Sequence, residues 1–193
     1  MIYMKGVSLI SNEKLMKSEY LVIRCKNGVP TAMTELIEVW IDPLYFYVRR
    51  FNLSEDESLD VIQDAWLRVL QKFRQLRKPA AFPAWLFKIT RNIVISHIQK
   101  NSKFETVCSD ENLNDIPQQD DAINLSGFSS QEIFESLDKL RVIHRECLVL
   151  HFIEGFSLNE IGIILGIPVG TVKSRLYYAK KSLKCLLKVE VKS

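Results

Sequence analysis

The residues best suited to chemistry lie on a basic stretch, residues 169–186, that contains no carboxylate. Apolar residues recur there at steps of four and three, which predicts a helix with one buried stripe. The stripe is expected to consist of Val172, Leu176, Ala179, Leu183 and Leu186. The opposite face carries hydroxyl, aromatic and cationic side chains that could bond to base edges and phosphates: Thr171, Lys173, Ser174, Arg175, Tyr178 and Lys181. An ordinary solvated basic face is the alternative interpretation.

The residues before this stretch predict a helix-turn-helix. Ser157 and Glu160 have the spacing of a capping box, which starts a first helix. Gly166 suits a left-handed turn, and Pro168 prevents the helix from continuing. A second helix then begins at about Val169, and in helix-turn-helix proteins this helix enters the major groove of DNA. The pattern therefore favours DNA binding.

Charge is distributed unevenly along the 193 residues. The net charge of +3 is too small to indicate a partner, but residues 169–188 hold six Lys or Arg and no acid. Residues 101–131 hold six acids and one lysine. No nucleophile–base set, phosphate-binding glycine loop or pair of catalytic carboxylates is recognisable, so the sequence predicts a binding protein rather than an enzyme.

The metal-ligating residue types call for a separate interpretation. His144, Cys147 and His151 share one face of a predicted helix and could supply three ligands. No fourth ligand lies nearby, and Cys147 is equally suited to a small core position, so neither a metal nor a cofactor is predicted. The four cysteines form no CxxC pair, which is typical of reduced intracellular thiols. No apolar run predicts a membrane span or a secretion signal, so we expect a cytoplasmic protein with no membrane partner.

Composition divides the chain into four parts. Residues 1–30 form a leader without a clear pattern, residues 31–101 form a helical domain, and residues 129–193 form a second helical domain. Residues 102–128 are polar and acidic and lack periodicity, which predicts a linker. The expected fold class is all-α, with two small helical domains, a helical bundle and a helix-turn-helix, joined by a flexible acidic linker.

Two features organise the first domain. Pro43 predicts a kink or break in its first helix. Ser54 and Glu57 form a second capping box, which opens the next helix. The buried seam of that helix is expected to be Leu59, Ile62, Trp66, Val69 and Phe73.

Three longer segments, "LDKLRVIHRECLVLHFIEGFSLNEIGIILGIPVGTVKSRLYYAKKSLK", "ESLDVIQDAWLRVLQKF" and "FPAWLFKITRNIVISHIQK", carry a resemblance to a known family. They are similar to region 4, to region 2.2, and to regions 2.3 and 2.4, in that order, of the extracytoplasmic-function (group IV) sigma factors of bacterial RNA polymerase. The chain departs from the family pattern at Arg141, where proline is usual, and at Gly162, where alanine is common. The resemblance implies a factor that recruits core polymerase to promoters and supports promoter melting. The alternative is a stand-alone regulator that binds duplex DNA.

The resemblance also implies three binding surfaces. The −35 element would contact the residues already named on the basic helix. The −10 element would contact Arg74, Arg77, Lys78, Lys88, Arg91, Asn92, Ser96 and His97. The clamp helices of the largest polymerase subunit would contact Asp60, Gln63, Asp64 and Leu67, although an ordinary solvated acidic face is the alternative. Trp85 could stack on a base but is better suited to the core.

Further partners follow from the same resemblance. The second-largest subunit would contribute its flap, and an anti-sigma factor is a possible regulator. The acidic linker would thread the polymerase cleft with charges that mimic nucleic acid: Asp110, Glu111, Asp115, Asp120 and Asp121.

Overall fold

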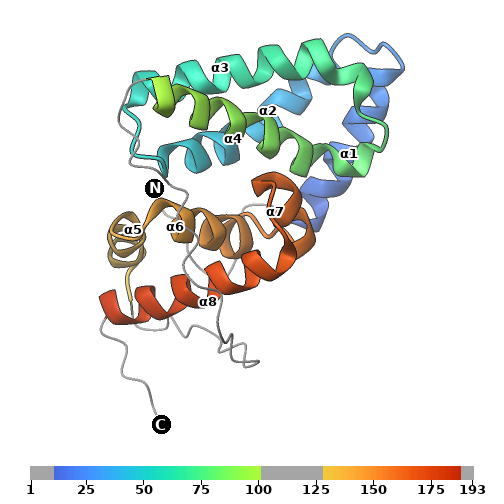
Figure 1. Cartoon of the computed structure of the whole chain (residues 1–193). Helices are drawn as coiled ribbons and strands as arrows, with labels where there is room; N and C mark the ends of the chain where they lie inside the picture. The colour runs from blue at the N-terminus through green and yellow to red at the C-terminus, as the bar shows by residue number, and fades with distance from the viewer. Residues whose placement is uncertain (1–10, 101–127, 188–193) are drawn as a thin grey trace.

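A computed structural model describes residues 11–100 and 128–187, and these two ranges contain helices and no strand, which confirms the all-α class (Figure 1). The predicted acidic linker, including the five acidic residues named above as mimics of nucleic-acid charge, lies outside the described residues apart from residue 128. The first domain contains α1 (Asn12–Lys26), α2 (Ala32–Arg49), α3 (Glu55–Lys72), two 3₁₀ turns, η1 (Phe73–Gln75) and η2 (Pro79–Ala81), and α4 (Phe82–Lys100). The second contains α5 (Ser130–Asp138), α6 (Val142–Leu148), the π-helical turn η3 (Val149–Ile153), α7 (Leu158–Leu165) and α8 (Val169–Leu186).

The first domain is built around aromatic side chains on α2 and α4. Trp40, Phe82 and Phe87 are fully buried, and the Trp40 ring meets the other two edge-on at 6.4 and 6.2 Å between centroids. The capping box at the start of α3 is confirmed, with the Glu57 N–H donating to Ser54 Oγ. Pro43 does not break α2, which runs on to Arg49.

Helix α1 is the main element that the sequence reading missed, because residues 1–30 showed no clear pattern. Met16 and Tyr20 are exposed, whereas the polar Ser18 is buried and accepts a hydrogen bond from Trp40 Nε1 at 3.0 Å. Leu21 and Val22 complete the buried face. The helix is therefore held by tertiary contacts with α2, and its own amphipathic pattern is weak.

The helix-turn-helix is confirmed as α7 and α8. The Glu160 N–H donates to Ser157 Oγ, and Glu160 accepts from the Ser157 N–H. Gly166 adopts φ +69°, the left-handed conformation that the turn requires. A Cβ atom on Gly162 would lie 3.0 Å from the carbonyl oxygen of Ile167, so glycine permits the close approach of the turn to α7.

Each of two expected buried stripes is buried except for one residue at its end. Leu59 of α3 is 51% exposed, and Val61 is buried. Leu186 of α8 is 41% exposed, and Leu187 is buried. Each helix packs against more than one neighbour, so its buried sector is wider than a single stripe and its edges are set by those neighbours.

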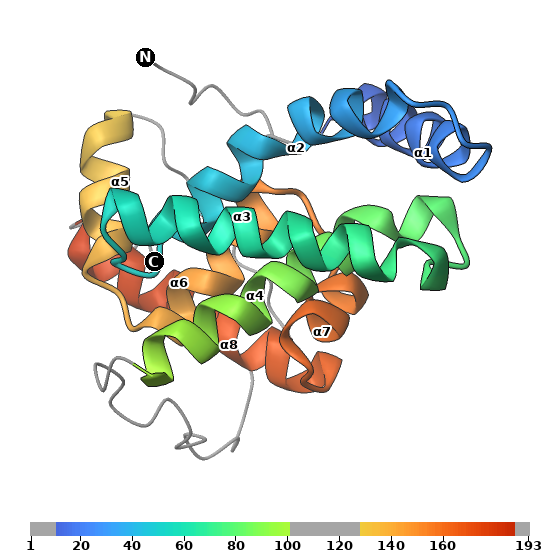
Figure 2. The same cartoon turned by 90° about the horizontal axis from the view of Figure 1, so that it is seen from above.

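The two domains pack directly against each other. Helix α7 lies against α4 (Figures 1 and 2). The rings of Phe87 and Phe156 meet at this contact, with their centroids 5.0 Å apart. One continuous cluster of buried apolar residues includes members from both domains. Among the described residues, no helix is long and apolar enough to cross a membrane.

Candidate nucleic-acid and polymerase interfaces

The predicted basic face of α8 is present, with one exception. Lys173 and Lys181 are exposed, and Thr171, Arg175 and Tyr178 are half-buried. Because α8 carries no Asp or Glu, a phosphate approaching this face would meet no repelling side chain from the helix itself.

Ser174 does not belong to that face. It is buried, at 3% exposure, and its hydroxyl donates to the carbonyl oxygen of Thr171 at 3.0 Å. Helix α8 packs against both α6 and α7, so more of its surface is buried than one apolar stripe. The expectation that Ser174 is available to DNA is therefore wrong for this arrangement.

Helix α4 presents a polar stripe to solvent. Lys88, Asn92 and Ser96 are exposed at spacings of four, so they share one face. The preceding turns add the exposed cations Arg74, Arg77 and Lys78. Cations beside an exposed amide suit a nucleic-acid strand, because lysine and arginine follow the phosphates and the amide can bond to a base edge. Trp85 is half-buried, with its ring 6.2 Å from that of Phe82.

Arg91 is turned away from this stripe and toward the second domain. Its Nε donates to Oε1 of Glu146 at 2.8 Å, and the side chain is only 19% exposed. Burial opposes its charge, but Glu146 and Tyr47 outweigh that effect and raise the pKa of Arg91. Arg91 therefore stays protonated and ion-paired within the protein.

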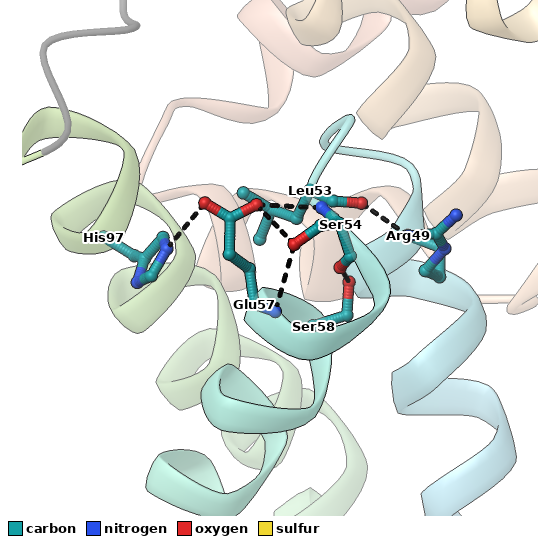
Figure 3. A network of polar contacts seen from close by, with 6 residues as sticks. All are labelled: Arg49, Leu53, Ser54, Glu57, Ser58 and His97. Atoms are coloured by element: carbon teal, nitrogen blue, oxygen red, sulfur yellow. Dashed lines mark hydrogen bonds and ion pairs between the residues drawn. The ribbon is translucent and has the colours of Figure 1, made fainter.

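His97 contacts the start of α3. Its Nε2 lies 3.4 Å from Oε1 of Glu57, whose other oxygen belongs to the capping box with Ser54 (Figure 3). In the same network Ser58 Oγ donates to the carbonyl oxygen of Ser54 at 2.7 Å, and Arg49 donates to that of Leu53 at 2.5 Å. The contact between His97 and Glu57 joins the last turns of α4 to the start of α3.

The four residues of the predicted clamp surface on α3 are all exposed. Asp60, Gln63, Asp64 and Leu67 all face solvent. Leu59 and Leu70 are 51% and 50% exposed beside them, and sequence reasoning missed both. Leu59, Gln63, Leu67 and Leu70 are separated by four, four and three positions. This spacing places the three leucines on one face of the helix and could have been recognised in the sequence. An apolar centre with a carboxylate rim is typical of a protein-binding surface.

The alternative metal site is not assembled. Cys147 is fully buried, and burial raises the pKa of its thiol to about 12. His151 Nδ1 lies 3.0 Å from the carbonyl oxygen of Phe156. Within residues 11–100 and 128–187, no three His, Cys, Asp or Glu side chains are grouped so that they could hold a metal ion.

Comparison with known proteins adds independent evidence. Residues 36–104 match the family model of Sigma-70 region 2, and residues 125–183 match that of Sigma-70 region 4. The ECF RNA polymerase sigma factor SigW of Bacillus subtilis is 30% identical over 173 residues, which cover 82% of this chain and 90% of that protein. The ECF RNA polymerase sigma factor SigL of Mycobacterium tuberculosis is 31% identical over 170 residues, covering 83% of this chain and 94% of the relative.

Solved structures share the fold. The sigma factor RpoE from Bartonella quintana, in complex with the anti-sigma factor NepR, superposes with a TM-score of 0.63 at 25% identity and covers 83% of this chain and 99% of that one. CnrH, in complex with the cytosolic domain of CnrY, superposes with a TM-score of 0.62 at 22% identity and covers 90% of this chain and 99% of that one.

Proposed function

The chain belongs to the extracytoplasmic-function family of RNA polymerase sigma factors, and we propose how its two domains divide the work of transcription initiation. The observation that carries the proposal is an exposed polar stripe on α4, a basic face on α8, and a separate exposed face of leucine and carboxylate side chains on α3. A stand-alone regulator is not favoured, because residues 36–104 match Sigma-70 region 2.

In this proposal α8 reads the −35 element in the major groove. Arg175 has the fork geometry for a guanine, while Thr171 and Tyr178 lie on the same face. Lys173 and Lys181 are exposed point charges suited to phosphates, which add affinity without sequence choice.

Helix α4 and the loop before it bind the −10 element once the duplex melts. Asn92 is the base-contacting residue, flanked on its stripe by Lys88 and Ser96. The cations of the preceding loop, Arg74, Arg77 and Lys78, follow the strand backbone. Arg91 and His97 would contact the DNA strand only after their contacts with Glu146 and Glu57, respectively, are broken.

The α3 face docks on the clamp helices of the largest polymerase subunit. Asp60, Gln63, Asp64 and Leu67 are exposed on successive turns of this face. The second domain is proposed to contact the flap of the second-largest subunit. An anti-sigma factor is a further proposed partner, because the structurally similar RpoE is bound to one. The chain works without bond chemistry of its own, in the cytoplasm, where polymerase and template are found.

Run-off transcription tests the proposal. Core polymerase of the source organism is supplied with a randomised promoter library, with and without the chain, and the products are sequenced. We expect transcripts from a defined promoter class only when the chain is present. Asn92→Ala should reduce these transcripts, whereas Gln131→Ala, which changes an exposed amide on α5, should not. Transcripts that do not depend on the chain would refute the proposal.

A further inference from the structure

The loop between α3 and α4, residues 73–81, is held by apolar side chains and exposes its cations. Phe73 and Leu76 are 8% and 5% exposed, and the Phe73 ring lies 6.3 Å from that of Phe82 at the start of α4. The exposed side chains of the loop include three cations: Arg74, Arg77 and Lys78. Leu76 lies between these cations in the sequence, so the position of its backbone affects where each cation lies.

Helix α1 contacts this loop at two places. It packs against η2, the 3₁₀ turn at the end of the loop (Figure 1). In addition, Lys26 in the last turn of α1 donates a hydrogen bond from Nζ to the carbonyl oxygen of Leu76. The two residues are 50 positions apart, so this bond joins α1 to the middle of the loop. A hydrogen bond from a charged donor is stronger than one between neutral groups.

The end of α1 that carries Lys26 is itself fixed to α2. Arg24 Nη1 lies 3.0 and 2.9 Å from the two carboxylate oxygens of Glu35 on α2. Its Nη2 lies 3.4 Å from the hydroxyl oxygen of Thr31, which precedes that helix. The N–H of Val29 donates to the carbonyl oxygen of Arg24 at 3.1 Å. Lys26 therefore reaches the loop from a supported position.

The bond from Lys26 acts at the junction between the two turns of the loop. Each 3₁₀ turn closes its own backbone hydrogen bond, of 3.2 Å at η1 and 3.0 Å at η2. The carbonyl group of Leu76 follows η1 and belongs to the peptide group that precedes Arg77. Rotation of this peptide group would break the bond to Lys26 and would redirect Arg77. The ammonium group thus fixes the orientation of that peptide group.

We propose that α1 holds this loop in its DNA-binding conformation, and that Lys26 is a positioning residue for selectivity toward the −10 element. Lys26 acts through the carbonyl group of Leu76, which sets the direction of Arg77. The selectivity part of this inference rests on the proposed function, in which the loop binds the −10 element. The support of the loop by Lys26 does not, because it is a contact within the first domain.

A fixed loop matters for selectivity because phosphate contacts set the register of a bound strand. Asn92, the proposed base-contacting residue, lies on α4, which begins where the loop ends. Cations held in one arrangement present one base to Asn92, whereas a loose loop lets the strand bind in several registers. The attraction to phosphates persists in a loose loop, because the cations remain. Loss of the Lys26 bond should therefore lower selectivity more than affinity.

Hydrogen–deuterium exchange of the free full chain tests the support of the loop. Lys26→Met removes the donor and keeps an unbranched side chain, whereas Lys26→Arg keeps a cationic donor. Lys17→Met removes an exposed lysine from the same helix and is the matched control. We expect residues 73–81 to exchange at least about threefold faster in Lys26→Met, and at the wild-type rate in the other two variants.

Selectivity is measured by fluorescence anisotropy with core polymerase that carries the full chain. One labelled single-stranded oligonucleotide has the −10 sequence selected in the run-off assay, and the other has the same bases in scrambled order. The readout is the ratio of the two dissociation constants, which a smaller folded fraction of a variant does not change. Lys26→Met should lower this ratio at least about fivefold, the low end for the loss of one base contact. Lys26→Arg and Lys17→Met should keep the wild-type ratio.

Three results would overturn the inference. Lys26→Met could leave the exchange of residues 73–81 unchanged, or it could loosen the loop and leave both affinities unchanged. It could also weaken binding of both oligonucleotides by the same factor, which would make Lys26 a phosphate contact. A failure of the proposed function would show differently, as a wild-type complex that binds both oligonucleotides equally while exchange still reports a loop that depends on Lys26.

Discussion

Glu154 makes the stability of this protein depend on pH. Its side chain is fully buried after η3, with no hydrogen-bonding partner for either oxygen, and the cation that acts on it is Lys14 of α1. Burial raises the pKa of Glu154 from 4.5 to about 8, because the charged form loses its hydration, and Lys14 offsets only part of this. Burial also lowers the pKa of Lys14 itself.

The sign follows from proton linkage. Between about pH 4.5 and 8 the folded protein holds a proton on Glu154 that the unfolded chain has released, so the free energy of unfolding falls as pH rises. With 1.36 kcal/mol for each unit of pKa, the loss from this group is about 3 kcal/mol by pH 7 and about 5 kcal/mol by pH 9. Below about pH 4.5 the contribution is fully present.

Urea unfolding between pH 5 and 9 measures this effect. We expect Glu154→Gln to match the wild type at pH 5 and to exceed its free energy of unfolding by at least about 2 kcal/mol at pH 9, because an amide has no charge to desolvate. Glu135→Gln changes an exposed carboxylate and should keep the wild-type slope. Parallel slopes for wild type and Glu154→Gln would refute this reasoning.

Three further predictions concern separate elements. Arg175→Ala should relax selectivity at one −35 position with a loss of about 1–3 kcal/mol, read from transcription of a promoter library; equal effects on all sequences would make Arg175 a phosphate contact. Leu67→Asp should weaken binding to core polymerase at least about tenfold in a pull-down titration, with an unchanged melting temperature because Leu67 is exposed. Ser157→Ala removes the hydroxyl of the α7 capping box and should cost about 1 kcal/mol of stability by thermal unfolding, and an unchanged melting temperature would contradict that role.

The sequence alone determined the features that depend on residues a few positions apart. A capping box joins residues three apart, so Ser54–Glu57 and Ser157–Glu160 were readable as helix starts. The left-handed turn at Gly166 could also be predicted from the sequence, because it depends only on the backbone conformation of that residue.

Only the tertiary structure decided which of the predicted binding side chains remain accessible to a partner. Arg91 and Glu146 are 55 positions apart, and no local pattern joins them. Ser174 is buried although it lies outside the predicted apolar stripe of its helix. Helix α1 depends on contacts with α2 more than on amphipathicity. Contacts of this kind depend on how helices that are distant in the sequence pack together. The helical spacing of apolar residues predicts only which residues share a face of one helix.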